Sequence, residues 1–123
     1  MDRRALGTAA ESVAREHLCA RGLKLVCENY RCRSGELDLV LIEGDVLVVA
    51  EVRLRSSARF GGARESIDWS KRRRILRATE HLRLTHRELR HLRVRFDVVA
   101  FEAATPGDAG VEWIRGAFDA CDR

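Results

Sequence analysis

Two alternating apolar runs joined by a short turn constrain the fold of this 123-residue chain more than any other feature. The first run is LDLVLI at 37–42, the second is VLVVAEVRL at 46–54, and EGD at 43–45 lies between them. Alternation with a period of two and an enrichment in Val and Ile are typical of strands, and a short connection containing Gly favours a β-hairpin. We therefore expect an antiparallel hairpin at the centre of the fold.

The segments around the hairpin predict one mixed domain. Apolar residues follow a period of 3.6 over residues 5–21, and Gly22 ends this helix. Further elements are expected in this order: a strand around 23–30, a loop at 55–66, a helix from Asp68 into the eighties, a strand at 94–101 and a short strand at 111–115. This order predicts an α/β or α+β fold in one domain over residues 1–123, in which the later strand joins the hairpin after the long helix.

The hairpin register predicts a cluster of charged side chains. With a two-residue turn at 44–45, Asp38 lies opposite Glu51 and Glu36 lies opposite Arg53, all on one face of the hairpin. Two carboxylates directly across from each other repel and destabilise a sheet. A bound divalent cation, a shared proton or a structural ion network that includes Glu36 and Arg53 would each offset this repulsion.

Charge is distributed unevenly along the chain, whose net charge is +4. Residues 53–95 contain fourteen Lys and Arg against four Asp and Glu, a net charge of +10, and the remainder has a net charge of −6. The second helix opens with the cations Lys71, Arg72, Arg73 and Arg74, which oppose the helix macrodipole. A phosphate at this helix end would offset that cost, so we expect these four residues to bind a nucleic-acid backbone, although a solvated helix end is the simpler alternative.

Several classes of protein are excluded or disfavoured by the sequence. No apolar run approaches the roughly 20 residues of a membrane span, and Glu11 and Glu16 interrupt any signal-peptide core, so we expect a cytoplasmic protein without a membrane partner. The four Cys and four His have no zinc-site spacing. Asp97 is expected to pair with Arg95 and to have no catalytic role.

Successive blocks of the sequence resemble a known family. ENYRCRSGELDLV, VLVVAEVRLR, SKRRRI and RFDVVAF are similar, in this order, to the YraN-like family of bacterial proteins predicted to be nucleases. Asp38, twelve further residues and then Glu51-x-Arg53 resemble the PD-(D/E)xK signature of the restriction-endonuclease-like superfamily, which includes archaeal Holliday junction resolvases. The likeness extends from about Gly7 to Phe118.

This resemblance implies a restriction-endonuclease-like α/β fold, with a central mixed β-sheet that has the β-hairpin at its core and helices on its flanks. It also implies a nuclease that uses Mg²⁺ or Mn²⁺ to hydrolyse DNA, double-stranded or branched. It implies that Asp38 and Glu51, with the Val52 carbonyl, hold the metal and that Glu11 completes the acidic site. Glu36 either touches the metal or pairs with Arg53. Symmetric cutting of a four-way junction would require a homodimer.

Arg53 departs from the signature, which has Lys at this position. Arginine stays protonated at any working pH, so Arg53 cannot be a general base, but it can hold a phosphate through two hydrogen bonds. With 21 Arg and only two Lys in the chain, the replacement also fits a general preference for Arg. Three functions therefore stay open: an endonuclease, a nucleic-acid-binding module of the same fold without catalysis, and a domain whose basic face binds an acidic protein.

Overall fold

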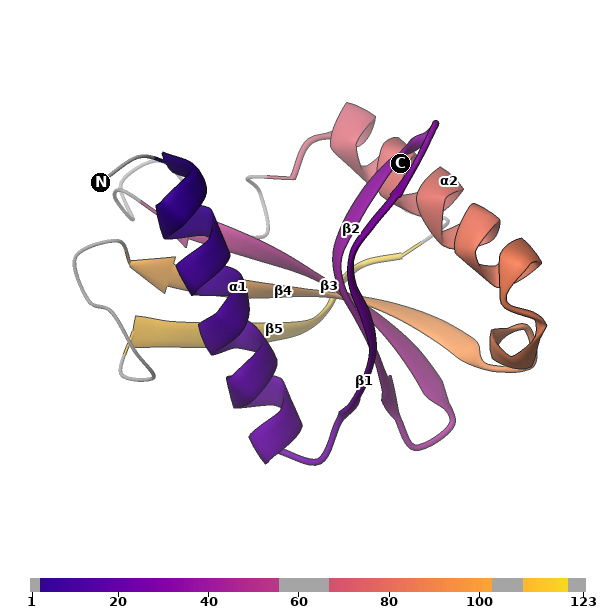
Figure 1. Ribbon diagram of the computed structural model, residues 1–123, viewed down its shortest axis with the longest axis horizontal. Helices are drawn as coiled ribbons and strands as arrows, with labels where there is room; N and C mark the ends of the chain where they lie inside the picture. Colours follow the sequence, from indigo (N-terminus) through magenta and orange to yellow (C-terminus); the bar gives the residue numbers. More distant parts are fainter. Residues whose placement is uncertain (1–2, 56–66, 103–109, 120–123) are drawn as a thin grey trace.

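The computed structural model describes residues 3–55, 67–102 and 110–119 (Figure 1). Its elements are α1 (Arg3–Ala20), β1 (Lys24–Cys32), β2 (Gly35–Glu43), β3 (Val46–Arg55), α2 (Trp69–Thr85), the short 3₁₀ helix η2 (Arg87–Leu89), β4 (Arg93–Glu102) and β5 (Val111–Phe118). The helices and strands predicted from sequence are all present, and only η2 was not anticipated. The loop expected at 55–66 lies, from residue 56 on, outside the described residues.

The five strands form one mixed sheet in the order β1-β2-β3-β4-β5. The β1–β2, β2–β3 and β4–β5 pairs are antiparallel, whereas β3 and β4 are parallel. A parallel pair needs a crossover connection, and α2 lies within the segment that connects β3 to β4. The prediction of a mixed α/β fold with a hairpin in its sheet is confirmed.

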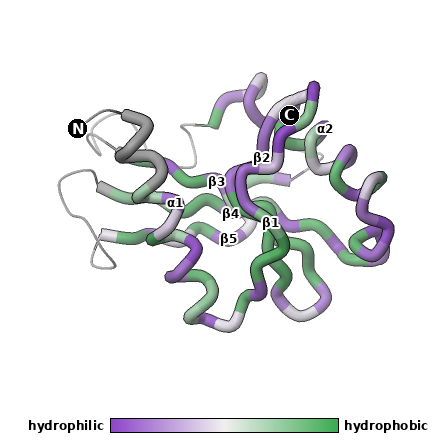
Figure 2. The backbone as a smooth tube through the Cα atoms, in the orientation of Figure 1, coloured by the Kyte–Doolittle hydropathy of each residue, from purple (hydrophilic) through white to green (hydrophobic). Residues whose placement is uncertain are grey.

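The two helices lie on opposite faces of the sheet (Figure 1). Apolar residues of α1, among them Ala14 and Leu18, form one core with strand residues such as Val48. On the other face, Ile75 and Leu82 of α2 form a second core with residues of all five strands. In Figure 2 the hydrophobic colour runs along the central strands and alternates with hydrophilic residues along α2. None of the helices in the described ranges is long and apolar enough to span a membrane.

The β2–β3 hairpin has the predicted register only in part. Residue pairs from Glu43 opposite Val46 to Leu39 opposite Ala50 are as expected, but the ladder ends there. The first half of β2 stays paired with β1, and the β1–β2 hairpin rises beside α2 (Figure 1). A Cβ atom on Gly35 would lie 3.1 Å from the Arg74 Cβ, so glycine permits this close approach.

The expected position of Glu36 opposite Arg53 is wrong, because β2 has left β3 before it reaches this residue. Glu36 instead lies across from Arg31 of β1 and forms an ion pair with it at 3.2 Å. Both side chains are largely exposed, so this ion pair contributes little to stability. A structural ion network between Glu36 and Arg53 is therefore not what offsets the repulsion between the hairpin carboxylates.

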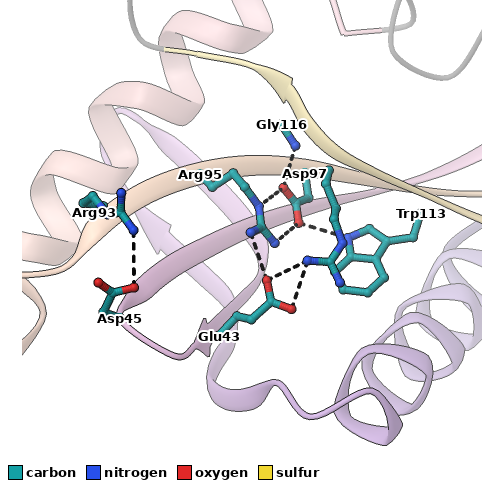
Figure 3. A network of polar contacts seen from close by, with 8 residues as sticks. Glu43, Asp45, Arg93, Arg95, Asp97, Trp113 and Gly116 are labelled. Atoms are coloured by element: carbon teal, nitrogen blue, oxygen red, sulfur yellow. Dashed lines mark hydrogen bonds and ion pairs between the residues drawn. The ribbon is translucent and has the colours of Figure 1, made fainter.

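Asp97 is fully buried and anchors a polar network between β4 and β5 (Figure 3). It accepts two hydrogen bonds from Arg95, one from the Trp113 indole and one from the Gly116 N–H, all at 2.9 Å. Gly116 has a φ of 60° where the β4–β5 register shifts, a conformation that glycine adopts without strain. Arg95 also pairs with Glu43, so the network ties β2 to β4. The structural role predicted for Asp97 is confirmed.

Candidate active site

A polar cleft opens where β2 separates from β3. Its volume is about 280 Å³, and its walls come from α1, from the two diverging strands and from the start of α2. The residues that line it are Ala10, Glu11, Asp38, Val52, Arg53, Leu54 and Lys71. The cleft therefore brings together Glu11, Asp38, Val52 and Arg53, which the sequence assigned to one site, and adds Lys71, which the sequence assigned to a different one.

Asp38 and Glu51 replace the backbone ladder with side-chain hydrogen bonds. The Asp38 backbone N–H donates to Glu51 Oε2 at 3.3 Å, and the Val52 backbone N–H donates to Asp38 Oδ2 at 2.8 Å. Each carboxylate thus binds the opposite strand just beyond the last ladder pair. The predicted juxtaposition of these two residues is confirmed, although it depends on side chains and not on strand pairing.

Burial and mutual repulsion disfavour the charged forms of both carboxylates. The Glu51 side chain is only 1% exposed, and burial together with the nearby Asp38 raises its pKa to about 8. Burial also raises the pKa of Asp38, partly opposed by the Val52 N–H and by Lys71 and Arg53. Carboxyl groups with strongly raised pKa values in a cleft are candidates for a functional site, because a cation or a proton must offset their charge.

Glu11 of α1 belongs to the same acidic cluster. Burial and the charge of Asp38 raise the pKa of Glu11, whereas a hydrogen bond with the Asn29 side chain lowers it. Asn29 has a φ of 52°, a left-handed conformation that Asn tolerates better than most residues. The structure thus places Glu11 beside Asp38 as the resemblance implied, and Asn29 is a neighbour that sequence analysis missed.

Two cations face the carboxylates inside the cleft. Lys71 Nζ lies 3.7 Å from Glu51 Oε1, and the Lys71 side chain is 27% exposed. Arg53 is half-buried, and its Nε is buried without a hydrogen-bond partner. A buried donor without an acceptor costs about 1–3 kcal/mol, so the cleft would gain from an anion that Arg53 can reach.

The four cations expected to act together at the start of α2 are divided by the fold. Lys71 turns into the cleft, whereas Arg72 donates to the Ile67 carbonyl at 2.9 Å and stacks over Trp69 and Phe118. Of the four, Arg73 and Arg74 are the exposed pair, and binding of a nucleic-acid backbone by these residues stays a prediction.

The donor set fits a hard divalent cation. Mg²⁺ and Mn²⁺ prefer carboxylate oxygens, and Mg²⁺ is commonly held by one or two carboxylates while its other ligands are water and substrate phosphate. Asp38 and Glu51 offer such a pair, and Val52 lines the same cleft. Within the described residues no three His, Cys, Asp or Glu side chains form a metal cluster.

Comparison with known proteins gives one consistent family. The model of the uncharacterised protein family UPF0102 matches residues 10–101. A UPF0102 protein of Methylococcus capsulatus is 51% identical over 116 residues, which cover 93% of this chain and 90% of that protein. UPF0102 proteins of Ectopseudomonas mendocina and Legionella pneumophila are 47% and 40% identical, and each alignment covers at least 93% of this chain and 94% of the relative.

Proposed function

The chain belongs to the uncharacterised protein family UPF0102, and from the geometry of its cleft we propose that it is a metal-dependent nuclease that hydrolyses phosphodiester bonds of DNA. One observation carries the proposal: the buried Glu51 carboxylate lies beside Asp38, a partly buried residue that lines a cleft together with two cations, Arg53 and Lys71. Membership supports the resemblance to the YraN-like proteins. From the same resemblance we infer that the fold is restriction-endonuclease-like.

Hydrolysis of a phosphodiester forms a P–O bond to water and breaks the P–O bond to the leaving oxygen. The water gives up a proton, and the leaving alkoxide takes one. In this proposal Asp38 and Glu51, with the Val52 carbonyl, hold Mg²⁺ or Mn²⁺, which when bound supplies charge neutralisation and an activated water. Arg53 donates its unpartnered Nε–H to a phosphate oxygen, and Glu11 carries further negative charge at the same site.

DNA is the proposed substrate because the cleft lies at the start of the basic helix. Arg73 and Arg74 are exposed within the first two turns of α2, where the helix dipole also favours phosphate. The surrounding block of residues 53–95 has a net charge of +10. Contacts of this kind bind the backbone without reading bases, which suits duplex or branched DNA.

A second candidate function is supported by one residue. Arg53 occupies the position of the signature Lys and cannot accept a proton from water. A chain that kept the fold and lost hydrolysis would still bind DNA through its basic surface. The two candidates differ in one measurable property, which is cleavage that requires a divalent cation.

The test combines metal binding with cleavage. Calorimetric titration of Mn²⁺ should give a heat of binding for the wild type and none for the Asp38→Ala variant. Linear, forked and four-way-junction DNA are then incubated with the wild type and Mg²⁺ or Mn²⁺, and the same reactions with EDTA should show no cleavage. Metal and DNA binding without cleavage of any of these substrates would favour the binding module, and the absence of metal binding would refute the metal site.

A further inference from the structure

Lys71, in the first turn of α2, contacts a buried carboxylate. The Lys71 backbone N–H donates to the N-cap residue Asp68 at 2.8 Å, which fixes this residue in the first helical turn. From there the ammonium group reaches across to Glu51 Oε1 at 3.7 Å. The contact joins the second helix to β3 at the point where the acidic pair sits.

The same cleft contains the position where the superfamily signature has its lysine, and here that position holds Arg53. A lysine ammonium is a compact charge with three donors that can turn toward different acceptors, whereas a guanidinium is a rigid planar fork. The ion pair with Glu51 leaves the Lys71 ammonium with donors for a phosphate oxygen and for a water molecule. The only other lysine in the chain, Lys24, is exposed on β1, so Lys71 is the only lysine that reaches the acidic pair.

We propose that Lys71 is a catalytic residue of this site, which contacts the scissile phosphate and orients the attacking water from α2 instead of from β3. The inference rests on the proposed nuclease function and extends it to a residue outside the signature. Arg53 then serves as a second phosphate contact. The site would thus have its lysine on α2 and an arginine at the signature position on β3.

The test compares wild type with Lys71→Met and with Arg77→Met, a control that removes an equal charge from an exposed position farther along α2. Single-turnover cleavage of DNA at saturating enzyme and Mn²⁺ should fall about 100-fold or more in Lys71→Met and less than about threefold in the control. DNA affinity measured with Ca²⁺ should change less than about fivefold in both variants. The double variant Lys71→Met with Arg53→Lys should recover part of the lost rate, because it returns a lysine to the signature position.

Metal binding provides a readout that does not depend on cleavage. Lys71 places a positive charge beside Glu51, so its removal should tighten Mn²⁺ binding about fivefold, whereas Arg77→Met should leave Mn²⁺ binding unchanged. Loss of Mn²⁺ binding in Lys71→Met would show that Lys71 only holds the site together, and would overturn its catalytic role.

The two levels of proposal fail in different ways. Cleavage by Lys71→Met at the wild-type rate overturns the role of Lys71 and leaves the nuclease function standing. A wild type that binds Mn²⁺ but cleaves none of the substrates overturns the nuclease function and the role of Lys71 with it.

Discussion

Replacing Glu51 by Gln should remove a pH-dependent loss of stability. The pKa of Glu51 is about 8 in the folded protein and 4.5 ordinarily. Between these two values the folded state binds a proton that the unfolded chain has released, so the free energy of unfolding falls as pH rises. Each pH unit is worth 1.36 kcal/mol, which gives a loss of about 3 kcal/mol between pH 5 and pH 7.

The Glu51→Gln variant keeps the shape of the side chain and an oxygen that can accept from the Asp38 N–H. Because the amide does not titrate, most of this pH-dependent loss should disappear, and the variant should be more stable than the wild type at pH 7 when EDTA is present. Addition of Mn²⁺ should stabilise the wild type and leave the variant unchanged, since binding to the folded state alone raises its stability.

Urea denaturation at pH 5, 6, 7 and 8, with EDTA or with Mn²⁺, measures both effects. The Glu36→Gln variant is the matched control, because it removes an equal charge from an exposed side chain of the neighbouring strand β2. Its stability should follow the pH dependence of the wild type. Parallel pH profiles for wild type and Glu51→Gln would refute the conclusion that the buried Glu51 carboxyl destabilises the folded state when it ionises.

Three further predictions concern the scaffold. The Asp97→Asn variant should lose about 3 kcal/mol of unfolding free energy in urea, because it breaks the buried pair with Arg95, while Mn²⁺ binding measured by calorimetry stays unchanged. The Asp68→Ala variant removes the N-cap of α2 and should cost about 1 kcal/mol by the same denaturation assay, with Asp68→Asn close to the wild type. The Gly116→Ala variant forces a side chain into a left-handed conformation and should lower stability by about 1 kcal/mol, and an unchanged melting temperature would contradict this strain.

The hairpin could be predicted from sequence because turn and alternation specify the same register. Gly44 has a φ of 61°, as a tight two-residue connection requires, and the apolar residues on both strands then face the two cores. A shift of one residue would exchange the two faces of each strand, so the pattern leaves little freedom. The same rules carry no information on where the ladder ends, which is why Glu36 was placed opposite Arg53.

The end of the ladder depends on tertiary packing. Leu37 belongs to the core beneath α2, whereas Leu39 belongs to the core beneath α1, although only one residue separates them along β2. Strict alternation would put both leucines on one face, so β2 turns its side chains between them. The two leucines pack against different helices, and the hairpin sequence alone does not predict which helix each of them contacts.

The position of Lys71 in the cleft also depends on tertiary packing and could not be predicted from sequence. Four consecutive cations look equivalent in sequence, and only the position of each residue around the helix separates Lys71, which faces Glu51, from Arg72, which lies over Trp69. The way α2 crosses the sheet decides which residue of its first turn enters the cleft. Sequence patterns predict that a helix begins at Asp68, but not which turn of it meets β3.

The location of the site follows from the different partners of β3 on its two edges. Its parallel pairing with β4 continues to Arg55, whereas its antiparallel pairing with β2 stops at Ala50. Beyond Ala50, β4 therefore still holds one edge of β3. On the other edge, the Val52 N–H donates to the Asp38 carboxylate instead of to a strand. Alternating charged residues on such a half-paired strand are fixed in position and still reach a cleft, and this combination of rigidity and access is what a site for a metal and a phosphate requires.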